Sequence, residues 1–335
     1  MKKILLLLIC LWFGVSYAQQ LQTSISVHDP VMIRQDSTYY IFCTGNGIAM
    51  WSSKDMVNWQ REKPVFETTP QWITDALPNF KRSFWAPDVS YYNGLYYLYY
   101  SVSAFGKNTS AIGLATNKTL HTGDATYQWI DHGQVIRSIP NQTNWNAIDP
   151  NLIIDNDGTP YLVFGSFWDG IKMVKLNKDR LTVAEDINRI PTIASRKIRS
   201  STVNPPSVDD NPVDAGGNAI EAPFVFKKGK YFYLFASIDY CCKGPKSTYK
   251  MIVGRSKNIK GPYLDKNQTD MARGGGSIVL AGDKDWYGVG HNAVCTFDGT
   301  DYLVFHGYDA SDNGKSKLRI EKLNWDNDWP VVTPH

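Results

Sequence analysis

Cysteine is scarce in this 335-residue chain, and its five cysteines are too few for a fold built around disulfide bonds. Four of them lie beyond residue 18: Cys43, Cys241, Cys242 and Cys295. The adjacent pair Cys241 and Cys242 is not expected to form a disulfide, because neighbouring residues can be bridged only with strain. Cys43 and Cys295 lie in or beside predicted strands and are expected to be buried thiols.

Excess charge of either sign is also lacking. The chain has 35 Lys and Arg against 32 Asp and Glu, a formal net charge of +3. Lys2 and Lys3 belong to a predicted leader, and without them a net charge of +1 remains. Such a balance provides no electrostatic surface for nucleic acid or an anionic membrane. We therefore expect a neutral partner.

Long apolar runs are absent after the first 18 residues. Residues 1–18 combine two lysines, an apolar stretch and a small-x-small site ending at Ala18, which predicts a signal peptide cleaved before Gln19. No later segment approaches the roughly 20 apolar residues that a membrane span needs. We expect an exported protein, secreted or periplasmic, that is not embedded in a membrane.

What the sequence does contain is a repeat of short aromatic strands. It occurs five times, and its equivalent tyrosines are spaced 57, 64, 72 and 69 residues apart: Tyr40, Tyr97, Tyr161, Tyr233 and Tyr302. Turn pairs such as Asn93-Gly94 and Asp298-Gly299 precede the strands, as in β-hairpins. With no convincing long helix, this period predicts an all-β, five-bladed β-propeller that forms one domain over residues 19–335. A β-sandwich is the alternative.

A second motif lies upstream of each aromatic strand. The blocks are HDP at His28, WAPD at Trp85, IDPN at Ile148, IEAP at Ile220 and GHNA at Gly290. Four of them place a titratable residue at the start of a predicted inner strand, namely Asp29, Asp149, Glu221 and His291, while the second has Ala86. If the repeats close into a ring, these four side chains converge at one end of the central channel.

Converging carboxylates would repel one another, so at least one should keep its proton to higher pH. A glycoside hydrolase needs such a pair, one carboxyl protonated and one ionised. Taken alone, Asp29 and Asp149 fit ordinary turns, because Asp before Pro commonly caps its own backbone. Glu221 is harder to explain structurally, since its apolar neighbours predict burial. The repetition favours catalysis for the set.

The blocks HDP, WAPD, NAIDPN, AIEAP, DYCCKG and GVGHNA resemble, in order, the endo-acting arabinanases of glycoside hydrolase family 43. The resemblance extends over essentially the whole chain after the leader. It implies an inverting enzyme with Asp29 as general base, Glu221 as general acid, and Asp149 as the carboxylate that orients the acid and, by its charge, keeps it protonated. It also implies that His291 contacts one calcium ion, coordinated mostly by water because calcium prefers oxygen ligands.

Substrate contacts are predicted from aromatic residues near the channel mouth and from polar groups that the resemblance suggests. The aromatic candidates are Phe84, Trp85, Phe105 and Trp168, although a tryptophan is by default more often in the core. The polar candidates are Asn146, Ser166 and the backbone of Gly106. Segment 195–218, rich in Pro, Asp, Ser and Gly, is either a surface excursion or a wall of the site.

The leading hypothesis is an exported, monomeric endo-1,5-α-L-arabinanase acting on arabinan or its oligosaccharides. A first alternative keeps the chemistry but acts from chain ends, as an arabinofuranosidase or β-xylosidase of the same family. A second alternative is a propeller that binds glycans without cleaving them. It is disfavoured because binding requires no set of three acids.

Overall fold

The computed structural model describes residues 21, 23–77, 80–140, 142–197 and 217–333; the predicted signal peptide and most of segment 195–218 lie outside them. Within this part, helices are short: α1 (Gln71–Ala76) and four 3₁₀ turns, η1 (Ile187–Arg189), η2 (Gly244–Lys246), η3 (Met271–Arg273) and η4 (Ala310–Asp312). None of the described helices is long and apolar enough to cross a membrane.

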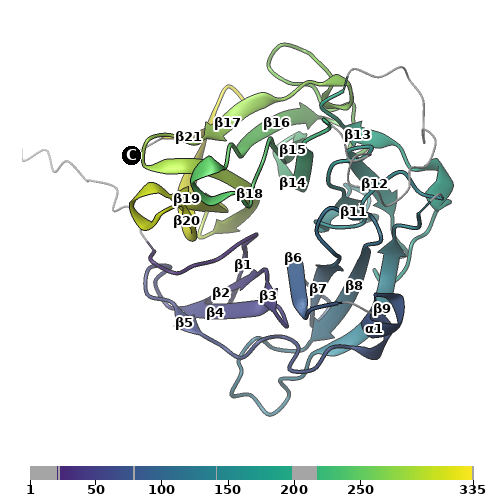
Figure 1. Ribbon diagram of the computed structural model, residues 1–335, viewed down its shortest axis with the longest axis vertical. Coiled ribbons are helices and arrows are strands. Elements are labelled where there is room, and N and C mark those ends of the chain that lie inside the picture. Colours follow the sequence, from purple (N-terminus) through teal and green to yellow (C-terminus); the bar gives the residue numbers. More distant parts are fainter. Residues whose placement is uncertain (1–20, 22, 78–79, 141, 198–216, 334–335) are drawn as a thin grey trace, which may run out of the picture.

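Five antiparallel sheets are arranged around a central axis (Figure 1), so the predicted five-bladed propeller is confirmed. Blade 1 contains β1 (Val31–Gln35), β2 (Thr38–Cys43), β4 (Ala49–Ser53) and β5 (Gln60–Arg61). Blade 2 contains β3 (Gly45–Asn46), β6 (Ser83–Tyr92), β7 (Leu95–Val102), β8 (Ala111–Asn117) and β9 (Ile130–Arg137). Here β3, which follows β2 in the chain, pairs with β6 and links the first two blades.

Each of the other three blades has four strands among the residues that the structure describes. Blade 3 contains β10 (Asn151–Ile154), β11 (Pro160–Phe164), β12 (Ile171–Lys175) and β13 (Thr192–Ala194). Blade 4 contains β14 (Ile220–Lys228), β15 (Tyr231–Ile238), β16 (Lys250–Ser256) and β17 (Ser277–Ala281). Blade 5 contains β18 (Trp286–Phe297), β19 (Thr300–Asp309), β20 (Lys315–Asp326) and β21 (Trp329–Val332).

The turns between first and second strands follow from local sequence. Tyr92 pairs with Leu95 across Asn93-Gly94, and both loop residues have positive φ, 47° and 82°. Asp298-Gly299 does the same in blade 5, with φ of 50° and 79°. Asn-Gly and Asp-Gly tolerate this conformation best, which is why these pairs make tight hairpins.

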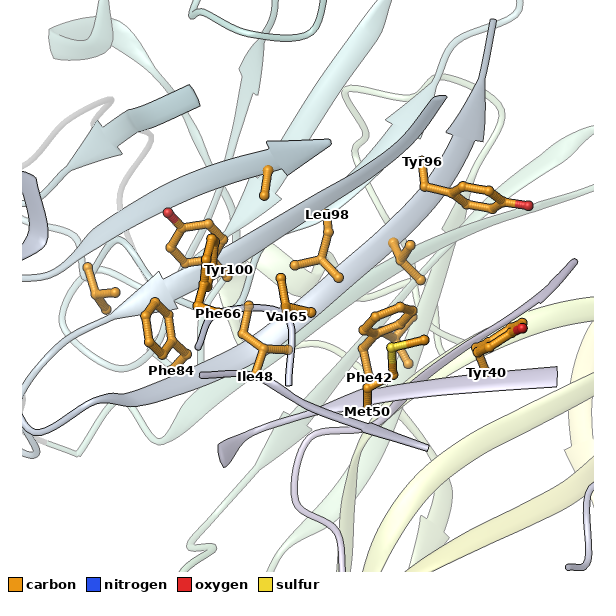
Figure 2. Packing of buried hydrophobic residues seen from close by; sticks show 14 of the residues in the cluster. Tyr40, Phe42, Ile48, Met50, Val65, Phe66, Phe84, Tyr96, Leu98 and Tyr100 are labelled. Carbon is orange, nitrogen blue, oxygen red and sulfur yellow. The ribbon is translucent and has the colours of Figure 1, made fainter. Parts of the chain in front are cut away.

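The core lies between neighbouring blades, and the repeated aromatic strands supply much of it. Figure 2 shows the largest shared cluster, in which Phe42 and Met50 of blade 1 pack against Phe84, Leu98 and Tyr100 of blade 2. Each such side chain stabilises the fold by about 1.5–3 kcal/mol when fully buried. Each repeat of the aromatic strand in the sequence therefore corresponds to one blade packing against the next.

The segment before β1 joins the first blade to the last. Leu318 of β20 donates its amide to the carbonyl of Ile25 at 3.0 Å, and the Thr23 hydroxyl donates to the carbonyl of Leu318 at 2.9 Å. These bonds hold the ring closed next to His28 and Asp29.

The expectation for the adjacent cysteines was wrong, because Cys241 and Cys242 form a disulfide in the turn after β15. In an extended backbone, successive side chains point to opposite sides. Cys242 instead has a left-handed conformation with φ of 65°, which turns the chain and brings the two sulfurs together. Cys43 and Cys295 are free thiols, as expected; Cys43 is buried, whereas Cys295 is only half-buried.

Candidate active site

Each inner strand has one residue in the left-handed conformation, two positions before the strand in blades 1 and 3 and within it in the other three blades. These residues are Asp29, Ala86, Asp149, Ala222 and His291, with φ of 53°, 44°, 58°, 52° and 53°. Such a φ is uncommon for residues other than glycine. Three of the five lie within register shifts of the ladder between the first two strands, in blades 2, 4 and 5. The repeated motif is thus a repeated bend of the backbone.

This bend corrects one assumed equivalence. Glu221 pairs with Ser237 in the blade 4 ladder, as Trp85 pairs with Ser101 in blade 2. The left-handed residue of blade 4 is Ala222, so Glu221 lies one position before Asp29 and Asp149 in the repeat. Its counterpart in blade 1 is His28, whose carbonyl accepts the amide of Thr44.

The amides of the left-handed residues hold the blades together around the axis. In four blades the acceptor is a side chain at the end of the second strand of the preceding blade. The four bonds run from Ala86 to Thr44 (2.9 Å), from Asp149 to Ser101 (3.0 Å), from His291 to Ser237 (2.8 Å) and from Asp29 to His306 (3.1 Å).

Blade 3 provides no such side chain, because the corresponding residue is Gly165, whose amide bonds the carbonyl of Ile148. A Cβ atom there would lie 2.5 Å from the carbonyl oxygen of Gly170, so only glycine fits. The carboxylate of Asp149 takes its place: Oδ2 accepts the amide of Ala222 at 3.0 Å. Asp149 is thereby fixed beside the backbone that carries Glu221.

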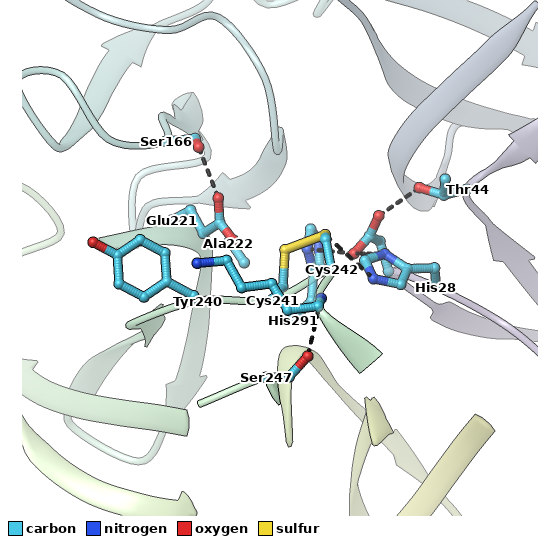
Figure 3. The surroundings of a disulfide bond; sticks show 12 residues. His28, Thr44, Ser166, Glu221, Ala222, Tyr240, Cys241, Cys242, Ser247 and His291 are labelled. Carbon is cyan, nitrogen blue, oxygen red and sulfur yellow. Dashed lines mark hydrogen bonds and ion pairs between the residues drawn. A yellow bond between two sulfur atoms is a disulfide. The ribbon is translucent and has the colours of Figure 1, made fainter. Parts of the chain in front are cut away.

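A cavity of about 710 Å³ lies at this end of the ring and is lined by residues of all five blades. Asp29, Asp149, Glu221 and His291 all line it, so the predicted convergence is confirmed. Figure 3 shows Glu221 and His28 on its two sides, with the disulfide between them in this view.

Asp29 is surrounded by hydrogen-bond donors. Its Oδ1 lies 2.8 Å from Nδ1 of His28 and 2.9 Å from Nδ1 of His291, and its Oδ2 accepts the Thr44 hydroxyl at 2.5 Å. Burial opposes ionisation, but the charges and hydrogen bonds of the two histidines outweigh it and hold the pKa of Asp29 well below its ordinary value. Asp29 is therefore an ionised carboxylate at neutral pH.

Glu221 shows the opposite tendency. Burial raises the pKa of Glu221, and the charge of Asp29 adds to this, although hydrogen bonds from Ser166 and Tyr249 oppose it. The Ser166 hydroxyl donates to Oε2 at 2.8 Å (Figure 3). The pKa values of Glu221 and Asp29 are thus displaced in opposite directions within one cavity.

Asp149 is buried beside the other two acids of the cavity. Burial, followed by the nearby charges of Glu221 and Asp29, raises the pKa of Asp149 to about 8. Burial is also the largest cause of the raised pKa of Glu221, so Asp149 and Glu221 both favour their protonated forms. The geometric contact with Ala222 persists in either protonation state.

The structure places the predicted substrate residues unequally. Trp85, Phe105, Gly106, Asn146, Ser166 and Trp168 line the cavity. Phe105 is 82% exposed, so its ring is accessible to a ligand, whereas Trp168 is buried. Phe84 was a wrong assignment: it has no exposed surface and packs against Phe66, Phe80 and Tyr100. It is adjacent to Trp85 in β6, and neighbouring strand residues face opposite sides.

Several cavity residues were not predicted, among them Thr44, Tyr240, Tyr308 and the two disulfide cysteines. For one of them, Thr44, the sequence contains a pattern that could have predicted its place. Thr44 occupies the position in its aromatic block that Ser101, Gly165, Ser237 and His306 occupy in the others. A polar residue after a run of aromatic ones, repeated along the chain, indicates a shared contact. Tyr240 and Tyr308 lie on loops and strand ends without such a pattern.

Calcium is predicted at His291, and the donor atoms there fit such an ion only through water. Nδ1 of His291 is engaged by Asp29, and although burial opposes a charge on the ring, Asp29 outweighs it and raises the pKa of His291 to about 9. Among the described residues, the groups of three donors close enough to share an ion are His28, Cys241 and Cys242, and His28, Asp29 and His306. Neither includes His291, and calcium prefers about six to eight oxygen ligands.

A cavity in which buried carboxyl groups have pKa values displaced in opposite directions, beside aromatic rings, is typical of glycoside hydrolases. The chain matches the glycosyl hydrolases of family 43 over residues 23–330 and belongs to that family.

The chain is similar to relatives with two modes of action. It is 50% identical over 309 residues, 92% of this chain and 86% of the relative, to the extracellular exo-alpha-(1->5)-L-arabinofuranosidase ArbA of Cellvibrio japonicus. It is 44% identical over 308 residues, 91% of this chain and 87% of the relative, to the extracellular endo-alpha-(1->5)-L-arabinanase 1 of Bacillus subtilis.

A solved structure of a Cellvibrio cellulosa alpha-L-arabinanase complexed with arabinohexaose superposes with a TM-score of 0.86, at 49% identity over 92% of this chain and 96% of that one.

Proposed function

We propose that this protein hydrolyses α-1,5-L-arabinofuranosyl linkages of arabinan with inversion of configuration. The observation that carries the proposal is the pair of opposite pKa directions in one cavity, raised at Glu221 and lowered at Asp29. The substrate is proposed from the relatives, which are named for α-(1->5)-arabinan chemistry, and from the arabinohexaose in a related structure.

In the proposed mechanism Glu221 is the general acid. Its protonated carboxyl donates to the glycosidic oxygen as the bond to the anomeric carbon breaks, and the Ser166 hydroxyl orients Oε2 during this transfer.

Asp29 is the general base, which removes a proton from the water that attacks the opposite face of the sugar. Inversion needs the two carboxyl groups roughly 6.5–9.5 Å apart, so that this water fits between them. Asp29 and Glu221 come from blades 1 and 4, which are not neighbours in the ring. Asp149 is proposed to position the acid through the Ala222 amide.

Aromatic side chains are proposed to bind the furanose rings. Trp85 and Phe105 come from blade 2, and Trp168 and Tyr240 come from the loops of blades 3 and 4. Polar contacts are available at Asn146, Ser166 and the backbone of Gly106, which also line the cavity.

We propose the endo mode, as in the relative at 44% identity that is named as an endo-arabinanase. A second candidate is cleavage from chain ends, because the relative at 50% identity is an exo-acting enzyme. We further propose that the enzyme is extracellular, since two relatives are named as extracellular. We also propose that it is monomeric and that it holds a calcium ion near His291, coordinated mainly by water.

Digestion of linear, debranched arabinan with product sizing over time tests the function and its mode. The endo mode gives a ladder of oligosaccharides early in the reaction, whereas the exo mode gives one short product throughout. No soluble product from linear arabinan at any time would contradict the proposed function.

A further inference from the structure

The Cys241–Cys242 disulfide forms part of the cavity wall, in the loop between β15 and β16. Cys242 is exposed, and its Sγ lies 3.8 Å from Nε2 of His28 (Figure 3). The disulfide is therefore in contact with the residue that precedes the proposed general base.

A continuous chain of hydrogen bonds connects this turn to Asp29. The amide of Cys242 donates to the Tyr308 oxygen at 2.7 Å, and that oxygen lies 2.8 Å from Nε2 of His28. Nδ1 of His28 lies 2.8 Å from Oδ1 of Asp29. Four groups from blades 4, 5 and 1 are thus linked in series, ending at the carboxylate.

The hydrogen bonds of this series all run in one direction, from donor to acceptor towards Asp29. The amide of Cys242 can only donate, so the Tyr308 oxygen accepts there and its own hydroxyl proton is left for Nε2 of His28. When Nε2 of His28 accepts that hydroxyl, the ring hydrogen lies on Nδ1, which donates to Oδ1 of Asp29 at 2.8 Å. Each donor points towards Asp29, so the turn determines which tautomer of His28 faces the carboxylate.

Packing holds the same ring in place. His28 stacks on His306 with ring centroids 3.9 Å apart, and the ring of Tyr308 meets His306 edge-on at 5.3 Å. His306 also accepts the amide of Asp29 at 3.1 Å. The orientation of Asp29 therefore depends on a cluster whose outer end is the disulfide turn.

We propose that Tyr308 and the Cys241–Cys242 disulfide are positioning residues for the general base, acting through His28. This inference rests on the proposed role of Asp29. It predicts that loss of either element lowers kcat, because a base displaced by a fraction of an ångström activates water poorly, while substrate binding at the aromatic wall is retained.

The first test is Tyr308→Phe, which keeps the ring packed against His306 and removes only the hydroxyl. On linear arabinan we expect kcat to fall roughly 10-fold to 100-fold with KM within about twofold of the parent value. The matched control is Tyr302→Phe, on the same strand β19 but outside the cavity, which should change neither constant. An unchanged kcat in Tyr308→Phe, or a raised KM alone, would overturn the positioning role.

The second test is reduction of the folded protein. Thiol labelling after denaturation should detect two free thiols beyond residue 18 before reduction and four after it, because Cys43 and Cys295 are already free. Reduction should lower kcat in the parent and have a smaller relative effect in Tyr308→Phe, where the chain is already broken. Equal relative losses in both proteins would show that the disulfide acts independently of Tyr308, and would overturn the proposed linkage.

Different results would contradict the proposed function and the positioning role of Tyr308 and the disulfide. If the parent protein releases no product from arabinan, the proposed function is wrong, and the positioning role that rests on it is overturned with it. If the parent is active and Asp29→Asn abolishes activity while Tyr308→Phe does not reduce it, only the positioning role is wrong.

Discussion

Asp149 holds the backbone amide of Ala222, the residue after Glu221, through a 3.0 Å hydrogen bond to its Oδ2 atom. In the other four blades, the equivalent amide bonds a side chain at the end of a second strand. Gly165 has no side chain to offer, so a carboxylate from the cavity replaces it. Because the Asp149 carboxylate takes the place of a side chain at position 165, a third acid lies in the cavity and contacts the backbone next to Glu221.

Asp149→Asn separates the charge of this residue from its hydrogen bond, because the amide oxygen can still accept from Ala222. In the parent, Asp149 ionises as the pH rises through about 8, and its negative charge then favours the protonated form of Glu221. Without that charge Glu221 loses its proton at lower pH. We expect the basic limb of the kcat/KM profile to move to lower pH, with a loss of about 10-fold above it.

The control is Asp75→Asn, which removes one exposed carboxylate on α1, away from the cavity. Its profile should superpose on that of the parent. Asp149→Ala should be worse than Asp149→Asn at every pH, because it leaves the Ala222 amide unpaired. Identical basic limbs in Asp149→Asn and the parent would contradict the coupling of Asp149 to the acid.

Glu221→Gln preserves the shape of the proposed acid and removes the proton it donates. General acid catalysis contributes about 10²–10⁴-fold, so we expect a loss of kcat in that range with substrate affinity retained. Calorimetric titration with arabinohexaose measures the affinity, and reducing-sugar release measures the rate. Glu67→Gln, at an exposed position outside the cavity, serves as the control. Parent-like turnover by Glu221→Gln would show that Glu221 is not the general acid.

The neighbours Phe84 and Trp85 should behave as opposites. Phe84→Ala empties a fully buried site between blades 1 and 2 and should reduce the free energy of unfolding by about 3–5 kcal/mol, leaving KM unchanged in the folded protein. Trp85→Ala should raise KM with little effect on thermal stability, since its side chain lines the cavity. Denaturant titration and steady-state kinetics on both variants distinguish the two, and a raised KM in Phe84→Ala would restore its predicted role at the substrate.

Metal removal tests the calcium hypothesis. Treatment with EDTA should lower kcat, and calcium but not magnesium should restore it, because the smaller ion demands stricter octahedral geometry. His291→Ala should abolish this response, whereas His132→Ala, an exposed histidine outside the cavity, should keep it. Absence of calcium from the purified protein, with no response of the parent to either treatment, would dismiss the ion.

Much of the architecture could be predicted because its determinants are local or periodic. Asn93-Gly94 defines a hairpin by itself, and the regular recurrence of the Tyr40 and Tyr97 strands indicates stacked blades. Convergence of Asp29, Asp149 and Glu221 followed from closing those blades into a ring.

The remaining features depend on contacts between distant residues. The one-residue offset of Glu221 arises from the left-handed Ala222, whose amide is bound by a side chain 73 positions away. The cause of the raised pKa of Glu221 is mainly burial, which is a property of the assembled cavity. By contrast, the error at Phe84 was avoidable, since strand geometry allows only one of Phe84 and Trp85 to face the cavity.

Time-resolved ¹H NMR of arabinohexaose hydrolysis tests the roles of Asp29 and Glu221 most directly. An ionised base and a protonated acid acting on opposite faces of the sugar predict that the β-anomer of the new reducing end appears first and then equilibrates. Initial appearance of the α-anomer would show retention through a covalent intermediate, and would contradict the assignment of Asp29 as a base acting on water.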